Sequence, residues 1–178
     1  MTWHRVWRVG SNIDTDALAP GAYMKQELKD IARHCLENRH PGLAQSISQG
    51  DVLVAGPNFG IGSSREQAVG VLVELGVKAV VAPSFSGLYF RNAFNLGLLA
   101  VVCPDAERIP EGSYVAVDPA NALIRNAAAA GGQAMAAGGP PPQVQTLPCQ
   151  KIPGFLIDMA AAGGLLNQLE QLYLARPA

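Results

Sequence analysis

The sequence has little charge, and the charge it has is balanced. Only 15% of its 178 residues are charged, and 13 basic against 14 acidic side chains leave a formal net charge of -1. This balance argues against nucleic-acid binding by a broad basic surface. A hydrophobic fraction of 49% excludes an intrinsically disordered chain. The scarcity of charge fits either a surface that a partner covers or a plain richness in alanine and glycine.

Long hydrophobic runs are also absent. The longest apolar stretches, Val69–Val73 and Ala79–Ala82, are too short to cross a bilayer and are bounded by charged residues, glycine or proline. The opening MTWHRVWRVGSN lacks the apolar run of a signal peptide. We therefore expect a cytoplasmic protein that does not bind membranes.

Cysteine and histidine are few and scattered. Cys35, Cys103 and Cys149 are far apart in the chain, so they predict no disulfide framework and no CxxC metal site. The three histidines form no HxxH or HExxH pattern. We predict that this chain holds no metal, and that any metal its function needs belongs to another chain.

The middle of the chain alternates strand and helix signals. Short apolar runs at Asp51–Ala55, Val77–Ala82 and Leu98–Cys103 are typical of buried strands. Helical spacing at Ser64–Leu75 and Gly87–Leu96 fills the gaps between them. This order predicts an α/β fold with parallel strands, and the length favours a single domain covering residues 1–178.

Four further segments are predicted before and after this unit. A strand at Val6–Val9 leads into a polar turn at Ser11–Asp16, and Lys25–Asn38 has helical spacing. A strand is expected at Ser113–Val117.

The C-terminal third is less regular. The Ala-, Gly- and Pro-rich stretch Asn126–Pro142 is predicted to be a flexible insertion within the single domain. Helices are expected after it at Phe155–Ala162 and Leu165–Leu174.

A glycine-rich turn, Gly56–Gly62, leaves the strand at residues 51–55 and leads into a helix. Free N–H groups and the helix dipole attract anions at such a place, and Arg65 adds a planar fork for a carboxylate or phosphate. Ser63 and Ser64 present hydroxyls beside it. The turn has no GK pair and no third glycine in GxGxxG spacing, which argues against a nucleotide site.

The same residues also have a purely structural interpretation. Ser63-x-x-Glu66 has the spacing of a capping box, in which the two side chains hydrogen-bond the first N–H groups of a helix. Because such caps are common, the turn taken alone favours capping over an anion site.

Four groups of motifs together resemble the swivel domain of the aconitase family. They are Asn12-Ile13-Asp14-Thr15-Asp16 with Pro20-Gly21-Ala22-Tyr23-Met24, the stretch from Gly50 to Ala68, the stretch from Ala82 to Leu98 with its Phe90-Arg91-Asn92-Ala93, and Ala162-Gly163-Gly164-Leu165. Their order and spacing hold from about residue 9 to about residue 170. Within that family the chain is most similar to the separate small subunits of isopropylmalate dehydratases and homoaconitase-like enzymes.

The resemblance implies a single swivelling β/β/α domain and a defined reaction. A 2-hydroxy acid loses water to give an alkene, and water returns at the neighbouring carbon. A 4Fe–4S cluster on a partner, the large subunit, acts as Lewis acid, and a serine alkoxide of the small subunit removes the proton. Ser63 matches that serine, and Ser64 and Arg65 match the residues that bind a substrate carboxylate.

We expect five further residues to support this site. These are Asp14, Thr15, Asp16, Gly60 and Gly62. Asp14 and Asp16 could form a metal or acid pair, but a turn that supports Arg65 is favoured because aspartate is common in turns.

The loop at residues 22–26 matches the segment that reaches over the variable end of the substrate. Apolar residues there go with an isopropyl group and a cation goes with an extra carboxylate, so Met24 followed by Lys25 gives a mixed signal. Lys25 either pairs with a distal carboxylate or is solvated, and solvation is favoured because exposed lysines are the rule.

The expected function is that of the small subunit of an iron–sulfur hydro-lyase that isomerises 2-isopropylmalate and 3-isopropylmalate in leucine synthesis. The same machinery acting on homoaconitate or a methylated malate is the alternative. A binding module that kept the fold and lost the reaction is a further alternative, which departures from the family pattern at Ile61, Gln67 and Gly87 motivate.

Overall fold

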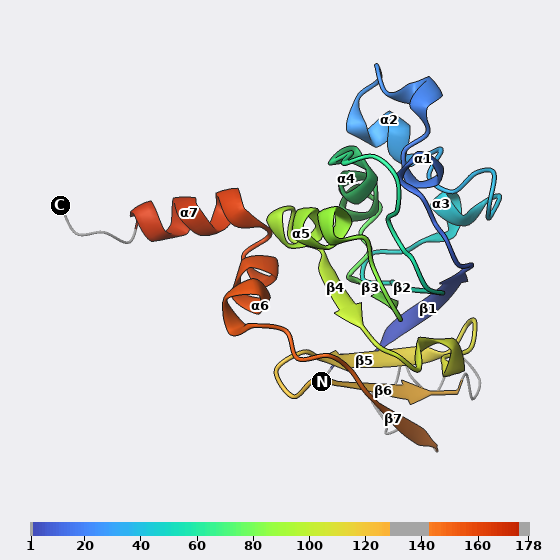
Figure 1. Cartoon of the computed structure of the whole chain (residues 1–178), viewed down its shortest axis with the longest axis vertical. Helices are drawn as coiled ribbons and strands as arrows, with labels where there is room; N and C mark the ends of the chain where they lie inside the picture. Colours follow the sequence, from blue (N-terminus) through green and yellow to red (C-terminus); the bar gives the residue numbers. More distant parts are fainter. Residues whose placement is uncertain (1, 129–142, 175–178) are drawn as a thin grey trace.

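The structure is a computed structural model that describes residues 2–128 and 143–174 (Figure 1). Most of the predicted insertion, residues 129–142, lies outside the described residues. Its first two residues were expected in a loop, but Asn126 and Ala127 lie in a strand instead, paired with neighbours on both sides.

Among the described residues, seven strands form one sheet in the order β4-β3-β2-β1-β5-β6-β7. The first four are parallel: β1 (His4–Val9), β2 (Val52–Ala55), β3 (Ala79–Ala82) and β4 (Leu99–Val102). The others are antiparallel: β5 (Tyr114–Asp118), β6 (Leu123–Ala127) and β7 (Val144–Pro148). Only two residue pairs join β1 to β5, and the antiparallel strands run at an angle to the parallel half (Figure 1).

The helices lie mainly in the connections of the parallel half. They are α1 (Thr15–Leu18), α2 (Leu28–Ala32), α3 (Leu43–Ser46), α4 (Gln67–Glu74), α5 (Gly87–Asn95), α6 (Gly154–Ala161) and α7 (Leu165–Leu174), with 3-10 turns η1 (Gly21–Tyr23) and η2 (Ala106–Arg108). Helices α4 and α5 join successive parallel strands and therefore cover the same face of the sheet. No described helix is both long and apolar enough to cross a membrane.

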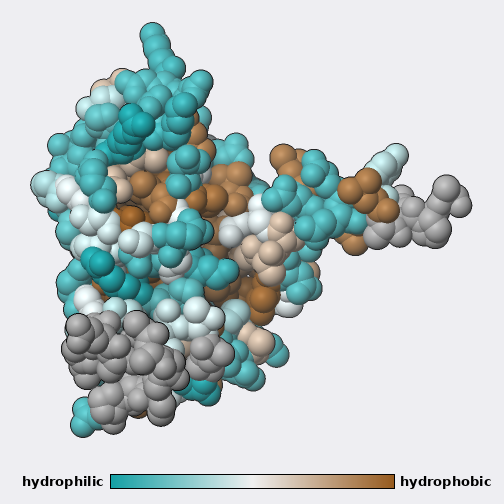
Figure 2. Space-filling model, turned by 180° about the vertical axis from the view of Figure 1, so that it is seen from behind, coloured by the Kyte–Doolittle hydropathy of each residue, from teal (hydrophilic) through white to brown (hydrophobic). Residues whose placement is uncertain are grey.

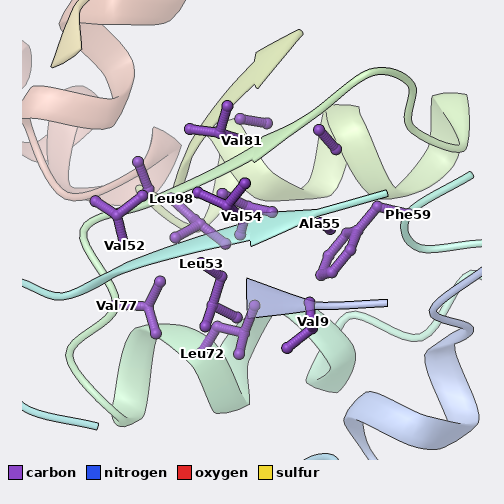
Figure 3. Packing of buried hydrophobic residues seen from close by; sticks show 14 of the residues in the cluster. Val9, Val52, Leu53, Val54, Ala55, Phe59, Leu72, Val77, Val81 and Leu98 are labelled. Carbon is purple, nitrogen blue, oxygen red and sulfur yellow. The ribbon is translucent and has the colours of Figure 1, made fainter. Parts of the chain in front are cut away.

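The core is centred on β2 and β3, whose eight residues are all buried. Leu53 points toward Leu72 of α4, while Val52 and Val54 lie on the opposite face of the strand (Figure 3). Strands covered on both faces need apolar residues at every position, which explains the unbroken runs in the sequence. The prediction of an α/β fold with parallel strands is confirmed.

The helix predicted at residues 25–38 is much shorter than expected. Only Leu28–Ala32 is helical, and Lys25 lies in a turn before it. The Leu36 N–H donates to the carbonyl of Ala17 at 2.8 Å, and Leu36 has a left-handed φ of 59°. This contact with α1 replaces the helical hydrogen bond to Ala32, so tertiary structure ends the helix despite its periodicity.

Helix α7 leaves the body of the molecule and carries an uncovered apolar face. It projects away from the sheet in Figure 1, and Figure 2 shows apolar side chains along it. Leu166, Leu169 and Leu172 are 74%, 51% and 60% exposed. An amphipathic helix normally buries such a face.

Two distant glycine motifs meet at the base of α7. Gly97 ends α5 with a φ of 82°, and a Cβ built there would lie 2.5 Å from the carbonyl carbon of Gly163. A Cβ built on Gly164 would likewise lie only 2.5 Å from the carbonyl oxygen of Asn95. Backbone therefore packs on backbone here, which fixes the α6–α7 turn against the end of α5.

We expect Gly97→Ala to destabilise the chain strongly, because the new methyl group would overlap the Gly163 backbone. Gly112→Ala is the matched control, since Gly112 also has a left-handed φ, of 70°, but a Cβ added there would meet nothing within 4 Å. The loss of stability in Gly112→Ala therefore measures the left-handed backbone strain alone, which is about 1 kcal/mol. Overlap adds about 1–3 kcal/mol in Gly97→Ala. Denaturant unfolding of both variants measures the difference, and equal losses would contradict this close packing.

Candidate active site

The glycine-rich turn is held between two other segments of the chain. The Gly60 N–H donates to the Ile13 carbonyl at 2.7 Å, and the Ile61 carbonyl accepts from the Thr15 N–H at 2.9 Å. On its other side the Phe59 N–H donates to the Ser84 carbonyl at 3.0 Å. The turn is therefore an extended segment hydrogen-bonded along both edges, and its position is fixed before any ligand binds.

Gly60 and Gly62 are required by this path. Their φ values of 77° and 104° lie in the left-handed region that glycine favours. A Cβ on Gly60 would overlap the ring of Tyr89, and one on Gly62 would come within 3.0 Å of the Thr15 Oγ1. Tyr89 is buried and packs edge-on against Phe59.

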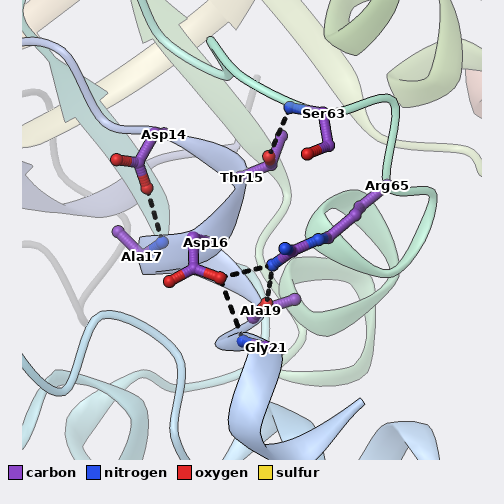
Figure 4. Close-up of polar contacts among 8 residues, drawn as sticks. All are labelled: Asp14, Thr15, Asp16, Ala17, Ala19, Gly21, Ser63 and Arg65. Carbon is purple, nitrogen blue, oxygen red and sulfur yellow. Dashed lines mark hydrogen bonds and ion pairs between the residues drawn. The ribbon is translucent and has the colours of Figure 1, made fainter.

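Ser63 is anchored by its backbone and free at its hydroxyl. Its N–H donates to Oγ1 of the buried Thr15 at 3.1 Å. The side chain is exposed, and its Oγ makes no hydrogen bond within the described residues. Figure 4 shows this hydroxyl directed into the space beside Arg65.

Arg65 is fixed through one of its three nitrogens. Its Nη1 donates to Asp16 Oδ1 at 2.6 Å and to the Ala19 carbonyl at 2.9 Å (Figure 4). Asp16 in turn accepts from the Gly21 N–H at 3.0 Å. Within the described residues every hydrogen bond of the Arg65 side chain uses Nη1, which leaves Nη2 and Nε for a ligand.

The sequence analysis did not identify two of the groups that help to hold Arg65 in place, the Ala19 carbonyl and Gly21. The Ala19 carbonyl is a backbone group with no side-chain signal, and Gly21 matters because it lacks a side chain. A Cβ on Gly21 would lie 3.2 Å from Asp16 Oδ1. The Pro20-Gly21 pair inside the matched family motif was the available clue.

Asp16 and Asp14 have separate roles. The pKa of the Asp16 carboxyl lies below its ordinary value of 3.8. The hydrogen bond from Arg65 is the main cause, and the hydrogen bond from the Gly21 N–H is the second. Asp14 caps α1 by accepting from the Ala17 N–H at 2.7 Å. The two carboxylates share no site, and no group of three or more His, Cys, Asp or Glu side chains in the described residues could hold a metal.

The capping-box interpretation of Ser63 and Glu66 is wrong. Helix α4 begins at Gln67, Glu66 is its N-cap, and no side chain caps it. Ser63 therefore lies well before the first helical turn. In the described part of the chain, the N–H groups of Ser64, Glu66 and Gln67 find no acceptor, so three donors remain near the exposed serines.

Met24 and Lys25 lie on the loop before α2 and behave differently. Half-buried Met24 lines a hollow of about 300 Å³, together with Glu66 and Gln67 at the start of α4. Lys25 is exposed and makes no ion pair within residues 2–128 and 143–174. The structure thus brings Met24 beside the start of α4 and leaves Lys25 solvated.

We expect Arg65→Gln to raise the pKa of Asp16 toward 3.8, because the charge and its hydrogen bond are removed. Carboxyl NMR titration measures this. The ion pair with Arg65 stabilises the fold at pH values above the pKa that Asp16 has in the unfolded chain. This stabilisation is lost as the pH falls through the lower pKa of Asp16 in the folded chain. Asp118, whose pKa is lowered by Asn121, should titrate unchanged in the same sample. An unshifted Asp16 would contradict the pairing.

Comparison with known proteins places this geometry in a family. Residues 20–106 match the model described as the aconitase C-terminal domain. A 3-isopropylmalate dehydratase small subunit of Syntrophus aciditrophicus is 38% identical over 168 residues, covering 93% of each chain. A methanogen homoaconitase small subunit of Methanothermobacter thermautotrophicus is 44% identical over 124 residues, which cover 68% of this chain and 71% of that protein.

A solved structure agrees with these relatives. The chain is similar to 3-isopropylmalate dehydratase of Methanocaldococcus jannaschii, with a TM-score of 0.79 and 34% identity over 97% of this chain and 95% of that one. The swivel-domain fold that the motifs implied is therefore confirmed. By fold, by motif order and by near full-length similarity, the chain belongs to the aconitase family, among the small subunits of 3-isopropylmalate dehydratases.

Proposed function

We propose that this chain supplies the base and the carboxylate-binding groups of a two-chain hydro-lyase that interconverts 2-isopropylmalate and 3-isopropylmalate, a step of leucine synthesis. One observation carries the proposal: the unbonded Ser63 hydroxyl lies beside an Arg65 guanidinium fixed through Nη1 alone. The relatives named as 3-isopropylmalate dehydratase small subunits support the choice of substrate.

In this proposal Arg65 and Ser64 bind one carboxylate of the substrate. Nη2 and Nε of Arg65 point two parallel N–H donors at it, a fork that lysine cannot reproduce. The Ser64 hydroxyl and the unpaired N–H groups at residues 64, 66 and 67 add donors. Because Asp16 and Ala19 already hold Arg65, little side-chain freedom is lost when the carboxylate binds.

Ser63 takes the proton from the carbon next to the one that carries the hydroxyl. The electron pair of that C–H bond forms the alkene as the hydroxyl leaves the other carbon. On rehydration the hydroxyl adds at either of the two carbons, and Ser63 returns the proton to the other one. A serine alkoxide is disfavoured in water, and the cationic Arg65 with the free N–H groups favours the charged form.

A partner completes the proposed site. The relatives are named as small subunits, which implies a large subunit. Among the described residues, no group of three or more His, Cys, Asp or Glu side chains is placed to hold a cluster. The proposal therefore assigns the 4Fe–4S cluster of the family to the large subunit. Three unpaired cysteines suit a reducing compartment, which supports a cytoplasmic location.

Homoaconitate is the second candidate substrate. The similarity to a methanogen homoaconitase small subunit favours it, and so does the presence of a cation, Lys25, on the loop beside the start of α4, where it would be available to a third carboxylate. The loop's other residue, Met24, is apolar and half-buried, which suits the isopropyl group instead.

We expect Ser63→Ala to lower kcat of the complex reconstituted with its large subunit by at least about a hundredfold, the usual range for a lost general base. The melting temperature should stay the same, because the Ser63 side chain is exposed and its hydroxyl is unbonded. Ser46→Ala, at another exposed serine, controls for substitution itself. Unchanged turnover in Ser63→Ala would exclude the assigned base. A wild-type complex that forms yet turns over no hydroxy acid would favour a binding module.

Lys25→Ala separates the two substrates. If the natural substrate is a tricarboxylate, KM for homoaconitate should rise about tenfold or more, the effect of one lost charge-assisted bond. KM for isopropylmalate should not change. Lys29→Ala is the control, since Lys29 is a nearby exposed lysine paired with Glu27. Equal effects on both acids would show that Lys25 does not read the variable end.

A further inference from the structure

Two of the three cysteines meet where two distant strands end. Cys103 follows β4 directly, and Cys149 follows β7 directly. The Gln150 N–H donates to the Val102 carbonyl at 2.8 Å, and the Cys103 Sγ lies 3.6 Å from the Pro148 carbonyl oxygen. These contacts lie on either side of the cysteine pair, so the backbone itself keeps the two residues adjacent.

The two thiols differ in surroundings. Cys103 is buried, whereas Cys149 is half-exposed. The neighbouring Cys149 thiol is the main cause that lowers the pKa of Cys103, and Cys103 in turn raises the pKa of Cys149. Cys35 has no such neighbour, and burial raises the pKa of its thiol to about 12. The chain therefore holds one pair of adjacent thiols, Cys103 and Cys149, and one separate, protonated cysteine, Cys35.

We propose that Cys103 and Cys149 form a redox site that hydrogen peroxide oxidises reversibly to an intramolecular disulfide. Cys149 is the accessible thiol, so its sulfur attacks one oxygen of the peroxide, the O–O bond breaks, and the other oxygen leaves as water with the thiol proton. The product is a sulfenic acid on Cys149. The Cys103 sulfur then attacks that sulfur, the S–O bond breaks, and a second water leaves. Two thiols are oxidised by two electrons and one peroxide is reduced.

The bridge would join the two halves of the sheet. It ties the end of β4, at the outer edge of the parallel half, to the segment that leaves β7 and leads to α6 (Figure 1). The closed loop contains β5, β6 and β7, so the bridge restricts a large part of the unfolded chain. None of the groups placed around Ser63 and Arg65 takes part, and the inference does not depend on the proposed function.

Peptide mapping tests the proposal on the full-length chain. The reduced protein is treated with hydrogen peroxide, its remaining thiols are alkylated in denaturant, and it is digested with trypsin. The three cysteines fall in separate peptides, residues 34–39, 92–108 and 126–151. We expect a cross-link between the last two that dithiothreitol removes, with the 34–39 peptide alkylated. The melting temperature of the oxidised chain should rise by about 5 °C or more.

The three single serine variants are the controls. Cys35→Ser should still form the cross-link and still gain the thermal shift, whereas Cys103→Ser and Cys149→Ser should show neither. Circular dichroism of each reduced variant establishes that it is folded. A bridge between two chains, a bridge that includes Cys35, or alkylation of all three cysteines after peroxide treatment would each overturn the proposal.

Discussion

The position of the glycine-rich turn is the constraint on which the rest of the site depends. Its backbone is hydrogen-bonded to residues 13 and 15 on one side and to residue 84 on the other. The turn therefore cannot shift without breaking the hydrogen bonds on both sides. Gly60 lets the turn pass directly over the buried ring of Tyr89. Segments from three parts of the sequence thus converge on one rigid path, and Ser63, Ser64 and Arg65 follow from where that path ends. Rigid support of this kind is what a preorganised site needs.

The fold fixes the side chain of Arg65 but leaves the hydroxyl of Ser63 free. Arg65 is held by a carboxylate, a carbonyl and the space that Gly21 leaves open, so its direction is set. Ser63 is held only by its backbone, and its hydroxyl has no partner within the described residues. A binding group gains from being fixed, because less freedom is lost on binding. In the proposed reaction Ser63 accepts and returns a proton, and a group with that role gains from having no competing hydrogen bond.

Local sequence signals predicted the parallel half of the fold well, because its strands are short, apolar and separated by helices that follow glycine-rich turns. They also predicted that an aspartate turn supports Arg65, where the structure places Asp16. They failed where a contact between distant residues decides the outcome. Leu36 bonds to Ala17 and ends a periodic helix early, and Ser63 bonds through its N–H to Thr15 instead of capping α4. Strands β6 and β7 escaped prediction because they are short and partly polar, and pairing with each other and with β5 stabilises them.

The site lies on the surface of the molecule, and its position there bears on why the sequence contains so few charged residues. Ser63 and Ser64 are exposed, and Arg65 is the partly covered exception at 26%. Exposed donors next to water stabilise a developing charge far less than donors in a water-excluded site. In the proposed function, the site would therefore stabilise a developing charge strongly only when the surface of a partner covers it. A chain with only 15% charged residues can be covered by a partner at little desolvation penalty. Within the proposed two-chain enzyme, this favours the partner-covered interpretation of the composition over mere richness in alanine and glycine.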